Sequence, residues 1–237
     1  MTDVTYRNDI TVQLVKSDAK DSDVALAARV STIGGSHEET VDLAKDAGLI
    51  NFLMRDRHGS PFEHNSFTFY IEAPIFVARE FFRHRAGWSY NEESGRYKEL
   101  EPTFYVPGPQ RDLVQVGKAG AYTFKPGSDY QKGMTRYVLE HTYKDVYEEY
   151  QALLEAGVAR EVARMILPVG IFTSFYATCN SRSLMHFLSL RTQREGSAFP
   201  SFPQREIELV AEDMEGIFEE LMPLTYAAFE KHGRVAP

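Results

Sequence analysis

The chain has 237 residues, 43% of them hydrophobic, and a formal net charge of −8. This length and apolar content are sufficient for one large domain with a hydrophobic core, which we place over residues 1–237. The acidic balance argues against a broad nucleic-acid-binding surface, and no apolar run reaches the roughly 18 residues that a membrane span needs. The single cysteine, Cys179, excludes an internal disulfide framework. Since the N-terminus also lacks the features of a signal peptide, we expect a cytoplasmic protein that binds neither nucleic acid nor membrane.

The first part of the chain predicts a strand followed by helices. Residues 10–14 alternate apolar and polar side chains, which is typical of a half-buried strand. An Ala-rich helix is expected over residues 24–30. A second helical stretch is expected to start at a Ser36 cap and to reach Arg57, with a break at Gly48.

A polar cluster over residues 58–64 follows, and Gly59 and Pro61 predict that it forms a turn. Two histidines and a glutamate within it could bind a metal ion. Their spacing matches no known zinc pattern, however, so we predict no metal site.

Residues 65–72 form the clearest strand, because alternate positions on one face are occupied by Phe67, Phe69 and Ile71. Pro74 ends this strand. A buried helix is then expected over residues 75–83, with Arg79 and Arg83 on one of its faces, either paired with local acids or facing a bound anion.

The segment of residues 83–97, which we call the arginine loop, is rich in groups that bind anions. Arg83, Arg85 and Arg96 carry planar guanidinium groups that suit phosphate. Asn91 and Glu92 provide donors and acceptors suited to the edge of a heterocycle. A solvated basic turn is the alternative explanation for such a cluster.

The rest of the chain predicts alternating strands and helices. Gly157 is expected to separate two helices, and Pro168 to end the second. Strands are expected over residues 103–106 and 171–179, a long loop over 107–130, and helices over 131–155, 158–167, 204–221 and 223–232.

A helix over residues 181–190, capped by Asn180, places further polar groups together. Arg182 and His186 are four residues apart and share a face. Asn180 and Arg191 lie about three turns apart along the same stripe. His186 could instead be a hydrogen-bonded core histidine, and Arg191 could be a helix-capping arginine with a structural role.

The arginine loop resembles the signature of the flavin-dependent thymidylate synthases, in which Arg-His-Arg is followed after seven residues by Ser. Here eight residues separate Arg85 from Ser94, and we place the extra residue within Ala86-Gly87-Trp88. The resemblance extends from Ala27 to about Leu209. It implies an α+β fold, with a mostly antiparallel sheet surrounded by helices, and a homotetramer with active sites at subunit junctions.

The resemblance also implies roles for individual residues. FAD would be contacted by Ser60, Arg83, His84, Arg85, Glu92, Asn180, Arg182 and His186. The nucleotide dUMP would be contacted by Glu80, Phe81, Phe82, Arg83, Glu92, Glu93, Ser94, Gly95, Arg96, Arg164 and Arg191. Arg191 is expected to be catalytic, because the family places an arginine against the pyrimidine there. Many members carry Gln at the position of Glu80, so we expect Arg83 or a neighbouring arginine to neutralise Glu80.

The activity implied by the resemblance is the methylation of dUMP to dTMP. Reduced FAD would supply the hydride and relay the methylene group of 5,10-methylenetetrahydrofolate, and NADPH would reduce the flavin. Cys179 lies in an apolar strand without an adjacent histidine, so it is not expected to serve as a nucleophile. The alternatives are another FAD-dependent enzyme acting on a nucleotide, or a non-catalytic protein that binds nucleotides or RNA.

Overall fold

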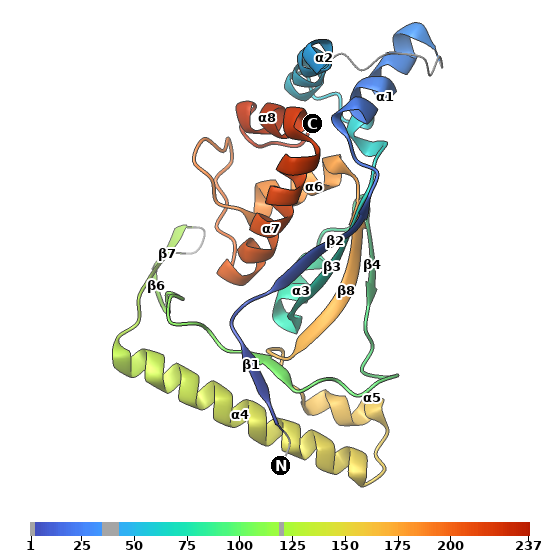
Figure 1. Cartoon of the computed structure of the whole chain (residues 1–237). Coiled ribbons are helices and arrows are strands. Elements are labelled where there is room, and N and C mark those ends of the chain that lie inside the picture. The colour runs from blue at the N-terminus through green and yellow to red at the C-terminus, as the bar shows by residue number, and fades with distance from the viewer. Residues whose placement is uncertain (1–2, 35–42, 119–120) are drawn as a thin grey trace. The chain divides into compact units, whose positions relative to one another are not determined.

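The computed structural model describes residues 3–34, 43–118 and 121–237 (Figure 1). The chain divides into two compact units. Unit 1 comprises residues 1–11, 72–81 and 92–175, and unit 2 comprises residues 12–71, 82–91 and 176–237. A single domain over the whole chain stays a prediction. No helix in the described parts of the chain is long and apolar enough to cross a membrane.

Four strands form the main sheet in the order β2 (Thr11–Ser17), β3 (Phe67–Pro74), β8 (Phe172–Cys179), β4 (Trp88–Glu92) (Figure 1). The Asp18 amide donates to the Ser66 carbonyl oxygen at 3.3 Å, and the Glu93 amide donates to that of Ser174 at 2.9 Å. Each bond joins the end of one strand to the start of its neighbour, which is the antiparallel arrangement. The α+β fold with a mostly antiparallel sheet is therefore confirmed.

Strand β3 follows the expected alternation. The side chains of Phe67, Phe69 and Ile71 are all 0% exposed. Thr68, on the other face, is buried too, and its hydroxyl lies 3.0 Å from that of Thr178. The strand prediction is confirmed, with both ends about two residues further along the chain.

Unit 1 is built on a long helix, α4 (Asp129–Glu155), which begins at the capping box of Ser128 and Gln131. Strand β1 (Thr5–Arg7) pairs in parallel with β5 (Thr103–Tyr105). The second half of α4 contributes buried tyrosines to the core of this unit: Tyr143, Tyr147 and Tyr150.

Two predictions in unit 1 are wrong in detail. The expected loop over 107–130 contains an antiparallel hairpin, β6 (Val114–Lys118) and β7 (Ala121–Lys125). The expected helix over 158–167 is instead a short helix, α5 (Arg160–Ala163), followed by a 3-10 turn, η2 (Arg164–Ile166). Most of the described glycines and prolines of this segment lie outside the two strands, at Gly108, Pro109, Pro126 and Gly127, but Gly117 lies within β6.

Unit 2 is largely helical. Helix α6 packs on α7, α7 packs on α8, and both α1 and α8 pack on α2. The helix predicted to start at Ser36 has its first residues outside the described ones, and Gly48 lies within α2 without breaking it. The bounds are α1 (Asp21–Ile33), α2 (Leu43–Arg55), α6 (Ser181–Arg191), α7 (Arg205–Leu221) and α8 (Pro223–Lys231).

The segment around the arginine loop differs from expectation at two points. Helix α3 (Ile75–Phe81) ends before Arg83, so Arg79 and Arg83 do not share a helical face. Residues 88–92, expected in a loop, form strand β4. In unit 2 the ring of Phe82 packs against that of Tyr90, with centroids 4.9 Å apart. The chain turns at residues 82–83, where the helix was expected to continue.

Candidate active site

The start of α6 is organised by Asn180. Its side-chain oxygen accepts from the Ser183 amide at 2.9 Å and so forms the expected N-cap. The next residue, Ser181, is fully buried and is bonded to Asn65 and to the Phe62 carbonyl oxygen. These bonds fix the first turn of α6 against the segment of residues 60–65.

The far end of α6 carries Arg191, whose Nε donates to Nε2 of His84 at 3.0 Å. His84 is 7% exposed. Burial lowers the pKa of His84 to about 4, with further contributions from the charges of Arg191 and His186. The imidazole is therefore neutral at ordinary pH, and Nε2 is a hydrogen-bond acceptor. The hydrogen bond shows that His84 and Arg191, far apart in sequence, are neighbours in unit 2.

Gly87, in the stretch where the extra residue of the arginine loop is expected, lies against α6. Gly87 has a φ of 69°, and a Cβ added to it would lie 2.1 Å from the hydroxyl oxygen of Ser183. The Ser183 hydroxyl donates to the Ala86 carbonyl oxygen at 3.0 Å. Only glycine fits this close approach and this backbone conformation, so the path of residues 86–88 depends on Gly87.

Aromatic rings hold the loop from the other side. Trp88 is stacked on Tyr90, with ring centroids 5.8 Å apart and planes at 7°, and it also contacts Phe187 of α6. The Tyr90 hydroxyl donates to the His84 carbonyl oxygen at 2.7 Å, and burial raises the pKa of Tyr90. These contacts fix the backbone of His84.

Arg83 and Arg85 flank His84 and are both exposed. Neither guanidinium group forms a hydrogen bond or ion pair with another residue that the structure describes. Two exposed guanidinium groups without a protein partner suit the charge and geometry of a pyrophosphate. The donor set around His84 therefore fits a dinucleotide such as FAD.

Arg182 is engaged by protein groups. Its guanidinium is paired with Glu63 at 2.6 Å and donates to the Pro237 carbonyl oxygen at 2.6 Å. Ser60 and Glu63 belong to a 3-10 turn, η1 (Ser60–Glu63), which packs against α6. The structure thus brings Ser60 and Arg182 into one region, while their contact with flavin stays a prediction.

His186 is exposed, so its interpretation as a core histidine is wrong. Its ring centroid lies 6.4 Å from that of His84, in an edge-to-face arrangement. An exposed imidazole beside the His84–Arg191 pair is available to a ligand.

A second set of predicted residues lies in unit 1, around the end of β4. Thr173 donates to the Glu92 carboxylate at 2.8 Å, and the Ser174 amide donates to the Glu93 carboxylate at 2.8 Å. Partial burial raises the pKa of Glu92. The Thr173 hydrogen bond and the charge of Arg164 lower this pKa, but by less than burial raises it. Both carboxylates are therefore tied to β8.

Ser94, Gly95 and Arg96 form a turn. The carbonyl oxygen of Ser94 accepts from the Tyr97 amide at 2.9 Å, and its hydroxyl oxygen accepts from the Arg96 amide at 3.3 Å. A Cβ on Gly95 would lie 3.3 Å from Cδ of Arg164, so the glycine lets that side chain pack closely. Arg96 is paired with Glu161 at 3.1 Å on an exposed surface. Two exposed arginines of unit 1 therefore lie at this turn: Arg96 is part of it, and Arg164 packs against Gly95.

Glu80, Phe81 and Phe82 follow each other at the end of α3, with different exposure. Glu80 is half-buried, whereas Phe81 is 0% exposed and packs on Phe175. The side chain of Phe81 therefore belongs to the core of unit 1, and only its backbone remains for the predicted contact with a nucleotide.

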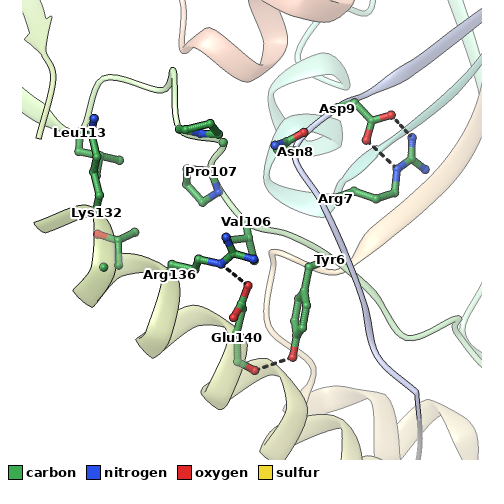
Figure 2. Close-up of a pocket in the computed structure, with 14 residues that line it drawn as sticks. Tyr6, Arg7, Asn8, Asp9, Val106, Pro107, Leu113, Lys132, Arg136 and Glu140 are labelled. Carbon is green, nitrogen blue, oxygen red and sulfur yellow. Dashed lines mark hydrogen bonds and ion pairs between the residues drawn. The ribbon is translucent and has the colours of Figure 1, made fainter. Parts of the chain in front are cut away.

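A pocket of about 420 Å³ in unit 1 contains none of the predicted residues (Figure 2). Arg7 is paired with Asp9, and Arg136 with Glu140, on its walls. These four charges are matched within the pocket and offer little to a charged ligand, whereas Lys132 also lines it.

Sequence reasoning missed three residues that support the predicted ones. Ser183 positions the arginine loop, Thr173 bonds Glu92, and Glu63 pairs with Arg182. The Asn180 cap, three residues earlier, shows from sequence that Ser183 lies in the first turn of a helix. It does not show that the Ser183 hydroxyl bonds to Ala86. The partners depend on the cross-strand register and on helix packing, which no local pattern reveals.

The only thiol of the sequence is buried. Cys179 is 3% exposed, and burial raises the pKa of its thiol. Among the described residues there is no group of three His, Cys, Asp or Glu side chains able to hold a metal ion. The side chains gathered here carry guanidinium groups, imidazoles, carboxylates and hydroxyls, and the imidazole of His84 is neutral.

Comparisons with known proteins show the family of this chain. Residues 13–224 match the family described as thymidylate synthase complementing protein. A flavin-dependent thymidylate synthase of Streptomyces avermitilis is 65% identical, over 98% of this chain and 96% of the relative. That of Streptomyces coelicolor is 61% identical, over 99% and 96%. The solved structure of the UMP/dUMP methylase PolB from Streptomyces cacaoi, bound with 5-Br dUMP, superposes with a TM-score of 0.94 at 52% identity, covering 99% of this chain and 100% of that one.

Proposed function

Since the chain belongs to the flavin-dependent thymidylate synthases, we propose that it methylates dUMP to dTMP with FAD, 5,10-methylenetetrahydrofolate and NADPH. The chain is an enzyme, so the alternative of a non-catalytic nucleotide- or RNA-binding protein is set aside. The matched region includes both the arginine loop and α6.

One observation carries the proposal: the single thiol of the chain is buried and its pKa is raised. A thiolate at Cys179 therefore cannot add to a pyrimidine, and the ring has to be activated by charge and orientation. A single buried thiol also suits a reducing cytosol, where we expect the enzyme to work.

The residues around His84 are proposed to hold FAD. Arg83 and Arg85 supply two exposed cations for its pyrophosphate, and His186 supplies an exposed imidazole. Asn180 and Arg182 at the start of α6 and Ser60 of η1 complete the set, and Glu92 is a further expected contact. When bound, the reduced flavin supplies the hydride.

The nucleotide is proposed to be bound by the turn of unit 1 and by charged residues near it. Arg96 and Arg164 would neutralise the phosphate, while Ser94 and Gly95 present a hydroxyl and a backbone amide. Glu92 and Glu93, held by β8, are acceptors for imide N–H groups. Arg83 and residues 80–82 are further expected contacts.

Arg191 is proposed to stabilise the negative charge that develops on the pyrimidine ring. Its guanidinium is permanently protonated and lies at the C-terminal end of α6, where the helix dipole also favours a cation. Held by His84, it is oriented before a substrate arrives. Preorganised charge of this kind is worth several kcal/mol to a transition state.

The direct test is the release of labelled hydrogen from carbon 5 of dUMP by the purified, flavin-loaded enzyme. Release should require both methylenetetrahydrofolate and NADPH, and NADPH alone should bleach the yellow colour of the flavin. Bleaching without release of label would point to another flavin-dependent reaction on nucleotides.

UMP is a second candidate substrate. PolB, which is 52% identical, is described as a methylase of both UMP and dUMP, and one of its structures contains 5-Br UMP. Parallel assays with the two nucleotides measure the ratio of their kcat/KM values. A ratio near one would extend the proposal to ribonucleotides.

We also propose a homotetramer with sites at subunit junctions. In support, the first half of α4 exposes large apolar side chains: Tyr130 (73% exposed), Met134 (44%), Tyr137 (66%) and Val138 (46%). Apolar rows of this kind commonly mark protein interfaces. A monomer in light scattering that still binds FAD tightly would contradict the proposal.

A further inference from the structure

The hydrogen bond between His84 and Arg191 has a definite direction. A guanidinium only donates, so at the observed 3.0 Å Nε2 of His84 must carry the lone pair and Nδ1 the proton. The bond uses Nε of Arg191, so the plane of the imidazole sets the orientation of the whole planar guanidinium.

The imidazole is itself held from several sides. The Tyr90 hydroxyl fixes the His84 carbonyl oxygen, and the Phe187 ring packs edge-on at 4.8 Å between centroids. A ring that is 7% exposed and held in this way has little freedom to turn.

The charged and titratable groups that face His84 are Arg191 and His186 from α6 and Tyr90 from β4. None of these three groups is a carboxylate, so none of them favours a protonated imidazole. Burial, Arg191 and His186 all lower the pKa of His84, to about 4. A protonated His84 would be a donor facing another donor, with like charges in contact, whereas the neutral ring is an acceptor throughout the working pH range.

We propose that His84 is a positioning residue for Arg191, which it orients toward the pyrimidine by accepting the Nε–H in its neutral Nδ1-protonated form. The inference rests on the proposed function. It adds that His84, which is expected to contact the flavin, also affects the reaction of the pyrimidine, because its hydrogen bond orients Arg191. His84 and Arg191 then form one functional pair, and removing either should disturb the same step.

A double-mutant cycle tests this pairing. The variants are His84→Leu, which removes the acceptor, His84→Gln, whose side-chain oxygen can still accept, and Arg191→Ala, alone and with His84→Leu. Each is assayed for dTMP formation at saturating dUMP, methylenetetrahydrofolate, FAD and NADPH. NADPH-driven flavin bleaching is measured in parallel as the control for cofactor binding.

We expect His84→Leu to lower kcat, referred to the fraction of enzyme whose flavin NADPH bleaches, by about tenfold or more, the size typical of a lost hydrogen bond to a charged group. His84→Gln should recover at least part of this loss. In the Arg191→Ala background, His84→Leu should cause no further loss. An additive loss in that background, or no recovery with Gln, would overturn the proposal.

A second readout does not depend on catalysis. In enzyme with ¹⁵N-labelled histidine, the His84 ring should show a protonated Nδ1 and an unprotonated Nε2, unchanged between about pH 5.5 and 8. The Nε2 resonance should shift in Arg191→Ala. A proton on Nε2, or a titration near pH 6.5, would refute the pairing. If the wild-type enzyme forms no dTMP, the proposed function fails, and the NMR measurement still decides the pairing.

Discussion

The Ser183 hydroxyl donates a hydrogen bond of 3.0 Å to the Ala86 carbonyl oxygen, which joins the first half of the arginine loop to the start of α6. The contact brings together two segments almost a hundred residues apart in sequence, in the stretch where we expect the extra residue of the loop. The backbone can come this close only because Gly87 has no side chain.

Replacing Gly87 with alanine should therefore destabilise unit 2. The φ of 69° strains any L side chain, and the new Cβ would lie 2.1 Å from the Ser183 hydroxyl oxygen. We expect the free energy of unfolding in urea to fall by about 2–3 kcal/mol. Gly196 is the matched control, because its φ is 82° with no atom within 4 Å of an added Cβ. Gly196→Ala should cost only about 1 kcal/mol. Equal costs for the two variants would show that the contact with Ser183 is not tight.

The stability of the protein should depend on His84 in mildly acidic solution. Its folded pKa, about 4, lies below the model value of 6.5. Between these values the unfolded chain binds the extra proton, so the contribution of His84 is fully present above about pH 6.5 and declines as the pH falls toward 4. Its full size is roughly 3 kcal/mol. Urea unfolding at about pH 7 and pH 5 should show a smaller loss of stability for His84→Gln than for wild type. The same loss in both proteins would contradict the lowered pKa.

Local patterns predicted the elements that carry the site. Strand β3 followed from the alternation of Phe67, Phe69 and Ile71, and the start of α6 followed from Asn180, because side-chain burial and capping are short-range effects. The arginine loop could be identified from the types of residue it contains, and the structure places its first half beside α6.

The contacts within the site could not be predicted in the same way. The bond between Arg191 and His84 joins residues 107 positions apart, and the bond between Thr173 and Glu92 depends on strand register. The end of α3 was misplaced because the apolar pattern continues through Phe82, although packing on Tyr90 turns the chain. In each case tertiary contacts override or complete the local signal.

Glu80 is expected to be a tolerated carboxylate near the nucleotide. It is half-buried next to the end of α3, and a carboxylate close to a phosphate needs a compensating cation. Glu80→Gln should therefore change dUMP affinity by less than about tenfold, or roughly 1.4 kcal/mol, in a calorimetric titration. Complete loss of binding would show that the carboxylate itself is required.

Ser94 is expected to position dUMP without reacting with it. Its hydroxyl oxygen already accepts from the Arg96 amide at 3.3 Å, and a serine nucleophile would need a base within hydrogen-bond reach. Ser94→Ala should slow turnover or weaken dUMP binding by about tenfold without abolishing either. Mass spectrometry of the wild-type enzyme quenched during turnover should find no adduct at Ser94. A covalent bond between Ser94 and the pyrimidine would overturn this role.

The central claim is that Arg191 activates the pyrimidine by charge in an enzyme whose thiol is buried and protonated. The most direct measurement is label release from carbon 5 of dUMP by Arg191→Ala, beside wild type and Arg191→Lys. We predict that Arg191→Ala folds, binds FAD and is bleached by NADPH, but releases label at least about a hundredfold more slowly. Arg191→Lys should recover only part of the rate, because a point charge does not reproduce the planar guanidinium. Label release at the wild-type rate by Arg191→Ala, or failure of that variant to fold, would contradict the account.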